Sequence, residues 1–248
     1  MASGADLIVV AGGDGTVNEA AEGVIHTPVP LAILPGGTAN VLAMEIRLGK
    51  RIGRATERLE ECLPYRISVG HVSCGTEVSR HFLLMAGIGL DAYIVRNVNS
   101  ALKARTGKFA YWVAGWSLLG RKLAQMDVEV DGRSYGRCSF ALASKVRNYG
   151  GDFEIAREVT LCDDQFEVIL FAGKSSAPYV KYFAGMATNR LKGMRGVTVV
   201  RGQRINLHTV GDRPAWVQVD GELAGVVPAE IRVVPDAMTL LVPPGYGK

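Results

Sequence analysis

The sequence lacks the features that mark membrane-spanning, secreted and zinc-binding proteins. No apolar run reaches the ~18 residues that a spanning helix needs. The N-terminus has no basic region ahead of an apolar one, so we expect neither a transmembrane helix nor a signal peptide. Only 4 cysteines and 4 histidines occur in 248 residues, and none form a C-x-x-C or H-x-x-x-H pair. Neither a zinc site nor a disulfide framework is therefore indicated.

Acidic residues are absent from one long stretch. Between Val168 and Gly211 there is no Asp or Glu, although seven basic residues lie there: Lys174, Lys181, Arg190, Lys192, Arg195, Arg201 and Arg204. Residues 1–64 carry a net charge of −3 and the rest of the chain +7. This change of sign favours two parts, the second of which faces an anionic partner. A solvated basic face without a partner is the alternative, and no nucleic-acid-binding motif is present.

The first sixty-four residues read as alternating strands and helices. An apolar run from Asp6 to Ala11 predicts a buried parallel strand, and a helix is expected over 17–25, capped by Thr16. A second strand over 31–34 leads into a helix beginning at Ala39, with Thr38 as its cap. A third helix is expected over 51–62. Strand, glycine turn and helix, repeated, predict an α/β domain over residues 1–64.

Past Pro64 the pattern changes to short strands separated by turns such as Asp131-Gly132 and Asp220-Gly221. Strands are expected over 66–72, 79–86, 126–130, 136–144, 167–172, 196–200, 204–209, 215–219 and 239–242, with helices over 94–123 and 178–191. Evenly spaced strands with turn signals predict an antiparallel sandwich or barrel over residues 65–248. The fold class is therefore α/β plus β.

The first glycine-rich turn, Gly12-Gly-Asp-Gly-Thr-Val-Asn18, lies where a strand ends and a helix begins. The unpaired N–H groups and the dipole of a helix N-terminus favour phosphate there, and glycines let the backbone approach an anion. Asp14 would repel bare phosphate but would attract phosphate-bound Mg²⁺. We expect Asp14 in a surface turn, where its replacement by Asn leaves the fold intact. The motif is neither a P-loop nor a G-x-G-x-x-G fingerprint, and a purely structural turn is the alternative.

A second turn, Pro35-Gly-Gly-Thr-Ala-Asn40, repeats this arrangement one strand later. Glycine turns at the carboxyl ends of neighbouring parallel strands face the same crevice, where ligands bind in open α/β sheets. The pair is therefore a stronger indication of a ligand site than either turn alone.

These residues carry a resemblance. Gly12–Glu19 followed by Leu34–Asn40 resembles the catalytic-domain signature of the diacylglycerol kinase/sphingosine kinase family of lipid kinases. Four further blocks continue the resemblance in the family's order: Ala86–Ala92, Tyr149–Phe153, Asp163–Val168 and Val219–Glu222. The resemblance implies ATP-dependent transfer of the γ-phosphoryl group to a lipid hydroxyl such as that of diacylglycerol. It also implies a nucleotide-binding domain like those of phosphofructokinase and NAD kinase, followed by a β-sandwich domain.

The resemblance also implies roles for single residues. Glu222 matches the family's general base, with Asp14 as a second catalytic carboxylate and Asp220 orienting the base or holding water. An ordinary Asp-Gly hairpin is the alternative for this turn. The nucleotide phosphates would be held by Gly12, Gly13, Asp14, Gly15, Thr16, Val17, Asn18 and Thr38.

A structural Mg²⁺ is implied for the loop 161–166. Its ligands would be the Asp164 carboxylate and the carbonyls of Leu161 and Phe166, an oxygen set suited to Mg²⁺. The family usually has Gly where this chain has Gln165. ATP and Mg²⁺ are thus the expected cofactors.

The chain departs from the family at three further places. Its strand over 6–11 lacks the preceding segment with an N-P-x-S-G turn, so we expect a fragment or a misplaced start codon. Many members have Asp where this chain has Val41 and Ser68, and fewer carboxylates would weaken an Mg²⁺–water network. Two alternatives therefore stay open: an NAD kinase-like enzyme with a soluble substrate, and a catalytically weak nucleotide- or lipid-binding homologue.

A partner surface is also expected. Aromatic and basic residues occur together over 103–122, and with the acid-free stretch 168–211 they suit an anionic phospholipid surface where lipid substrate is met. Packing of these aromatics against the sandwich is the alternative. We expect a cytoplasmic protein, peripheral at the inner membrane face, and a homodimer is compatible with the sequence.

Overall fold

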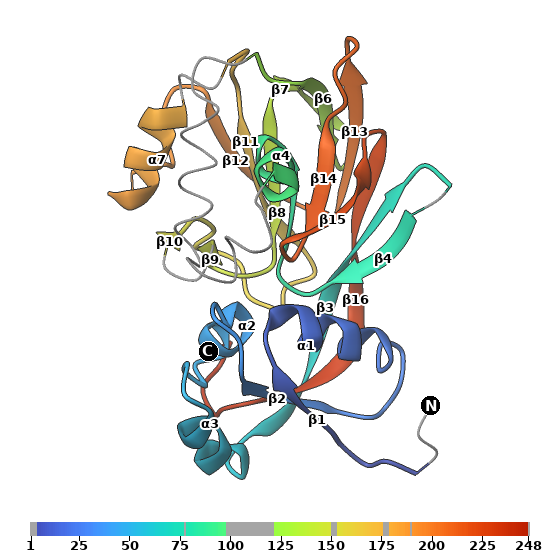
Figure 1. Cartoon of the computed structure of the whole chain (residues 1–248), viewed down its shortest axis with the longest axis vertical. Coiled ribbons are helices and arrows are strands. Elements are labelled where there is room, and N and C mark those ends of the chain that lie inside the picture. The colour runs from blue at the N-terminus through green and yellow to red at the C-terminus, as the bar shows by residue number, and fades with distance from the viewer. Residues whose placement is uncertain are drawn as a thin grey trace.

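The computed structural model of the chain describes residues 4–76, 78–97, 122–149, 153–175, 179–188 and 190–247. Figure 1 shows a smaller part, with α1, α2 and α3 around β1 and β2, below a larger part built of strands. The aromatic and basic stretch over 103–122, with most of the helix expected over 94–123, lies outside the described residues apart from Lys122.

The smaller part has the predicted strand, turn and helix order. Strand β1 (Ile8–Gly12) pairs in parallel with β2 (Leu31–Pro35), so that both strands end at the same edge. Helix α1 (Asp14–Glu22) follows β1, and α2 (Val41–Glu45) and α3 (Ile52–Leu59) follow β2. Helix α1 begins at Asp14 with Gly13 as its N-cap, three residues before the expected start, so Thr16 lies inside the first turn instead of capping it.

The larger part is a sandwich of two sheets. Its elements are β3 (Leu63–Cys74), β4 (Val78–Phe82), β5 (Met85–Gly89), α4 (Leu90–Asn97), β6 (Gln125–Val130), β7 (Arg133–Cys138), β8 (Phe140–Ser144), β9 (Asn148–Tyr149), β10 (Phe153–Glu154), β11 (Phe166–Phe171), α7 (Tyr179–Ala187), β12 (Val197–Gly202), β13 (Arg204–Val210), β14 (Trp216–Val219), β15 (Glu222–Val226) and β16 (Ala229–Val242). One sheet runs β12-β11-β8-β5-β14-β15, and the other contains β16, β13, β6 and β7, with β3 and β4 attached at β16.

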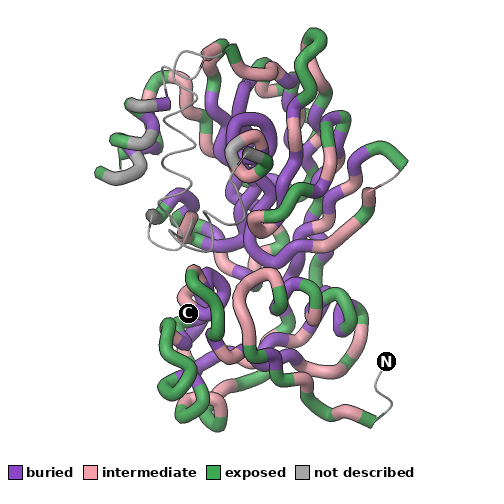
Figure 2. Tube along the Cα trace, viewed as in Figure 1, coloured by how far each residue is buried: buried purple, intermediate pink, exposed green. Residues whose placement is uncertain are grey.

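Buried side chains of both sheets fill the space between them. This core includes Phe82 and Val128 from one sheet and Ile88, Phe166 and Val217 from the other. Figure 2 shows burial concentrated along these strands, whereas α3 is largely exposed. The α/β plus β-sandwich fold class predicted from the sequence is confirmed.

Two long strands join the parts. Strand β16 pairs with β3 over most of its length, and at its far end Leu240 pairs in parallel with Leu31 of β2. The smaller sheet therefore continues into one sheet of the sandwich, as Figure 1 shows for β3 and β16. The predicted boundary at Pro64 falls at the second residue of β3.

The bounds of some predicted strands differ in the structure, and a specific contact or bulge explains each difference. The strand expected over 79–86 is two strands, because the N–H groups of Leu83 and Leu84 donate to the carboxylate of Asp220. Only the end of β16 was expected, since Pro235 and Asp236 interrupt its pattern; the structure accommodates them as a bulge between Val234 and Met238.

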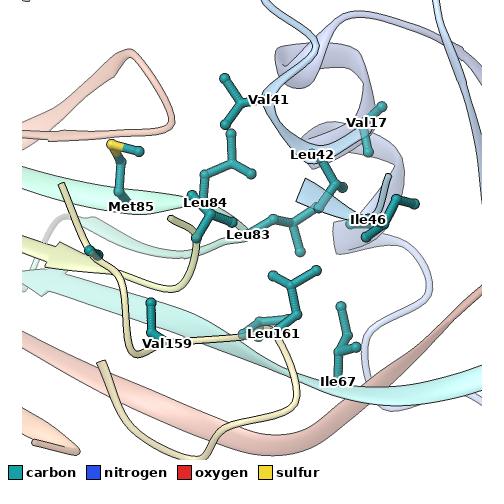
Figure 3. Close-up of a cluster of buried hydrophobic side chains, with 14 of the residues drawn as sticks. Val17, Val41, Leu42, Ile46, Ile67, Leu83, Leu84, Met85, Val159 and Leu161 are labelled. Carbon is teal, nitrogen blue, oxygen red and sulfur yellow. The ribbon is translucent and has the colours of Figure 1, made fainter. Parts of the chain in front are cut away.

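A second apolar cluster lies where the two parts meet. Figure 3 shows Val17 of α1 and Leu42 of α2 on one side, with Leu83, Leu84 and Leu161 from the larger part facing them. All five side chains are almost fully buried. This cluster fixes α1 and α2 against the segment 83–85.

Among the described residues, no helix has the length and apolar content to span a bilayer.

Candidate functional site

The two glycine-rich turns lie against each other. The Gly36 N–H donates to the Gly12 carbonyl at 2.8 Å, and a Cβ on Gly37 would come within 2.5 Å of the Gly13 Cα. Only glycine permits backbones to approach this closely. The glycines therefore have a structural role, turn against turn, beyond the approach to phosphate expected from the sequence. A small pocket at this junction is lined by residues of both turns, including Asp14 and Asn40.

Asp14 ties the first turn to the second. Its Oδ2 and Oδ1 accept the N–H groups of Val41 and Leu42, both at 3.1 Å. These are the first N–H groups of α2, which the Asn40 side chain does not cap. Asp14 thus caps a helix that is distant in sequence. The structure corrects the expectation that Asp14 lies in a surface turn where its replacement by Asn leaves the fold intact, because its carboxylate holds the start of α2.

The N-terminus of α1 has no side-chain cap. The first-turn N–H groups near Gly13 and Gly15 thus lie without a side-chain cap at the positive end of the helix dipole, the arrangement that favours an anion. The exposed hydroxyls of Thr16 and Thr38 lie on these two turns. Val17 and Asn18 are buried instead, and the Val17 N–H donates to the Gly13 carbonyl within the helix.

Asp220 anchors the turn between β14 and β15. Its carboxylate accepts three backbone N–H groups, from Leu83 at 2.8 Å, Leu84 at 3.0 Å and Met85 at 2.9 Å. Burial raises the pKa of Asp220 to about 6, with the carboxylate of Asp14 adding to the effect. Asp220 and Gly221 both have positive φ, as a two-residue hairpin loop requires. The ordinary-hairpin interpretation is therefore right for the backbone, and it does not exclude a chemical role for the next residue.

Glu222 projects from this hairpin over the first turn of α1. A Cβ on Gly15 would lie 3.4 Å from the Glu222 Oε1, so the carboxylate reaches the glycine-rich turn 207 residues earlier in the chain. Arg80 of β4 pairs with it, Nη2 to Oε2 at 3.2 Å, and about half of the Glu222 side chain is exposed. The structure thus brings together the expected base and the expected phosphate turn.

A buried pair holds the hairpin from behind. The Gln218 Oε1 accepts the Gly221 N–H at 2.8 Å, and its Nε2 donates to the Asp91 Oδ2 at 2.6 Å. Tyr149 donates its hydroxyl to the other oxygen of Asp91. Burial raises the pKa of the Asp91 carboxyl. Asp91 and Gln218 therefore fix the amide next to Glu222.

Carbonyls of the loop expected to hold a structural Mg²⁺ already accept hydrogen bonds from residues elsewhere in the chain. The Leu161 carbonyl accepts the Ser68 N–H at 3.0 Å, and the Asp163 and Gln165 carbonyls accept the ammonium of Lys145. Asp164 is exposed, and Phe166 begins β11. Burial lowers the pKa of Lys145 to about 8, so it carries a positive charge at pH 7. The expected ligands Leu161, Asp164 and Phe166 lie next to these two carbonyls in the loop, so Mg²⁺ held there would meet the like charge of Lys145, and the site does not suit it.

Lys145, Arg80 and Gln218 were not found by sequence reasoning. Lys145 follows the apolar run Phe140–Ser144, and this placement is a signal for a buried charge. Arg80 and Gln218 carry no local signal, since their partners are distant in sequence. Among the residues that the structure describes, there is no cluster of three or more His, Cys, Asp or Glu side chains suited to a metal.

Comparisons with known proteins identify the family of the chain. Residues 1–76 match the family model of the diacylglycerol kinase catalytic domain, and residues 85–242 match that of the YegS C-terminal NAD kinase beta sandwich-like domain. A diacylglycerol kinase of Bacillus subtilis (strain 168) is 25% identical over 234 residues, covering 91% of this chain and 74% of that protein. One from Mycobacterium tuberculosis (strain CDC 1551 / Oshkosh) is 26% identical over 247 residues, 98% of this chain and 79% of that protein.

A solved structure shares the fold. The crystal structure of a diacylglycerol kinase from Bacillus anthracis str. Sterne has a TM-score of 0.76 at 22% identity, covering 98% of this chain and 80% of that one. At this identity the likeness speaks for the fold alone.

Proposed function

The chain belongs to the diacylglycerol kinase family of lipid kinases, which are phosphotransferases, and from this membership we propose that it moves the γ-phosphoryl group of ATP to the hydroxyl of a lipid such as diacylglycerol. The observation that carries the proposal is the position of Glu222, whose carboxylate lies over the uncapped N-terminus of α1. Kinase chemistry needs a proton acceptor next to a phosphate site, and these two features supply both.

In the proposed step, the lipid hydroxyl oxygen forms a bond to the γ-phosphorus while the bond from that phosphorus to the leaving oxygen of ADP breaks. The hydroxyl proton passes to a Glu222 oxygen. The first-turn N–H groups of α1 face the phosphates, where fixed dipoles stabilise the developing charge without reorganising. Arg80 holds the Glu222 carboxylate through its ion pair, so that the oxygen facing Gly15 is presented to the substrate.

Mg²⁺ enters this proposal as the counter-ion of the nucleotide phosphates, whose charge it neutralises when bound. Asp14 is the residue proposed to meet it. Each of its oxygens accepts one backbone N–H, and a carboxylate oxygen has a second lone pair available. Asp14 would thus have two tasks, capping α2 and orienting the metal-bound phosphate.

Lipid substrates also require a membrane-facing surface, which we assign to the surroundings of α7. Three basic residues of the stretch 168–211 pair with acids from elsewhere: Lys192 with Glu158, Arg201 with Asp163 and Arg204 with Glu230. The other four are exposed: Lys174, Lys181, Arg190 and Arg195. These four support peripheral binding to anionic phospholipid at about 1 kcal/mol per charge.

The experiment is a turnover assay with ATP and Mg²⁺ on a panel of acceptors in mixed micelles. The panel contains diacylglycerol, monoacylglycerol and sphingosine, with NAD as a soluble acceptor. We expect phosphate transfer to a lipid and none to NAD. Transfer to NAD alone would contradict the lipid proposal and favour the NAD kinase-like alternative.

A further inference from the structure

Lys145 is a charged side chain in the interior of the protein. Its relative exposure is 0%, which is rare for lysine unless the charge is paired or hydrogen-bonded. It directly follows β8, and its N–H donates to the Leu84 carbonyl at 2.8 Å. An ammonium group buried at such cost needs acceptors for its three N–H bonds.

The acceptors are oxygens of one loop and one strand. The Lys145 Nζ donates to the Ser68 Oγ at 2.7 Å, to the Asp163 carbonyl and to the Gln165 carbonyl at 3.4 Å. The Ser68 hydroxyl in turn lies 3.2 Å from the Leu161 carbonyl. A hydroxyl and two carbonyls converging on one positive centre resemble a hard-cation site, except that the cation is covalently part of the chain.

Two carboxylates lie near this centre, although the charge of Arg201 partly offsets them. The carboxylates of Asp163 and Asp164 both stabilise the charge on Lys145. Asp163 is itself fixed, since its Oδ2 accepts the Thr160 N–H at 2.7 Å and its Oδ1 pairs with Arg201 at 2.9 Å. Thus the loop is preorganised around the ammonium.

We propose that Lys145 is the resident cation of the loop 160–166, which therefore folds without the Mg²⁺ that the family resemblance implies there. The residue at position 68 fits this assignment, because the hydroxyl of a neutral serine accepts a hydrogen bond from the ammonium of Lys145. Main-chain contacts connect this centre to the Glu222 hairpin, because the Lys145 N–H donates to the Leu84 carbonyl and the Leu84 N–H donates to Asp220. The inference does not depend on the proposed kinase activity.

The first test is thermal unfolding of the full chain in EDTA and in increasing Mg²⁺. A metal that binds only the folded chain raises the melting temperature with its concentration. We expect the parent to melt at the same temperature in both. A rise with Mg²⁺ that Asp164→Asn removes would place a metal in this loop and overturn the proposal. If the melting temperature rises with Mg²⁺ equally in the parent and in Asp164→Asn, the metal binds outside this loop, and the proposal that the loop folds without Mg²⁺ is supported.

The second test replaces the cation. Lys145→Met keeps the length of the side chain but leaves loop carbonyls unpaired, so the melting temperature should fall by about 4–10 °C. The matched control is Lys192→Met, which removes an exposed lysine paired with Glu158 and should shift it by no more than about 2 °C. Equal melting temperatures of the two variants would overturn the proposal.

A double variant, Lys145→Met with Ser68→Asp, provides the converse measurement. It removes the internal cation and adds a carboxylate at the position whose hydroxyl now accepts from Lys145. We expect its melting temperature to rise with Mg²⁺, unlike that of the parent. If neither Lys145→Met nor the double variant folds, the melting temperatures of the parent in EDTA and in Mg²⁺ decide the question.

Discussion

The structural role of Asp14 gives a prediction that sequence reasoning would have reversed. Asp14→Asn keeps the size of the side chain, but its single carbonyl oxygen can accept only one of the N–H groups of Val41 and Leu42. The amide NH₂ would face the other N–H, leaving a donor unpaired at the start of a five-residue helix. Loss of such a cap costs about 1–2 kcal/mol, and an unpaired buried donor about 1–3 kcal/mol. We therefore expect a loss of about 1–3 kcal/mol in the free energy of unfolding.

The assay is urea unfolding followed by circular dichroism, with Asp6→Asn as the control. Asp6 is an exposed aspartate eight residues earlier, and its substitution should change the free energy of unfolding by less than about 0.5 kcal/mol. An unchanged m-value would confirm that the shift in midpoint reflects stability. An Asp14→Asn protein as stable as the Asp6→Asn protein would refute the capping role. Turnover of the two variants is then compared at a temperature where both are folded.

Three further predictions concern the turns, the hairpin and the surface. Gly37→Ala places a methyl 2.5 Å from the Gly13 Cα, so calorimetry should show weaker ATP binding and a lower melting temperature. The control is Gly53→Ala in exposed α3, where no atom lies within 4 Å of the new methyl and the melting temperature should stay the same or rise. Nearly equal effects would exclude the turn contact as the cause. Since Asp220 has a raised pKa of about 6, the folded chain binds its proton more tightly than the unfolded chain, and this contribution to stability should be lost as pH rises from about 4 to about 6. The stability difference between the parent and Asp220→Asn should fall over that window, and a rise would contradict the assignment. Binding of the protein to anionic vesicles, measured by flotation, should weaken as salt is raised. The double variant Lys181→Gln, Arg190→Gln should bind more weakly than Lys192→Gln. Binding that does not respond to salt or to lipid charge would show that these basic residues form a solvated surface without an anionic partner.

Much of the fold could be read from the sequence because its signals are local. Apolar runs ending in glycine predict β1 and β2, and Asp220-Gly221 predicts a hairpin, as observed. Six motif blocks in order predicted the family, which the comparisons confirm. The larger part of β16 was not predicted, since its proline lies in a bulge that only pairing with β3 explains.

The site was predictable in its residue types and less so in its contacts. The sequence placed Asp14, the glycines and Glu222 in one site, but it could not show that Asp14 caps α2 or that Gly37 lies against Gly13. Lys145 shows the same limit. A single sequence shows a lysine after an apolar strand, whereas the oxygens that justify its burial come from Ser68 and from a loop eighteen residues or more away. Long-range polar contacts, not secondary structure, were the part that sequence patterns could not supply.

The proposed kinase step depends on Glu222 accepting the proton of the acceptor hydroxyl, and the turnover of one variant shows whether it does. Glu222→Gln keeps the size of the side chain and a hydrogen bond to Arg80, but the amide cannot take the proton. Loss of a general base costs about 10²–10⁴-fold in kcat, or about 3–5 kcal/mol of barrier, while ATP affinity should change little. An exposed hairpin residue without a chemical role would cost less than about 0.5 kcal/mol. A kcat reduced at least about a hundredfold, with unchanged ATP binding, is the result this account predicts; a Glu222→Gln protein that phosphorylates lipid within about threefold of the parent would contradict it.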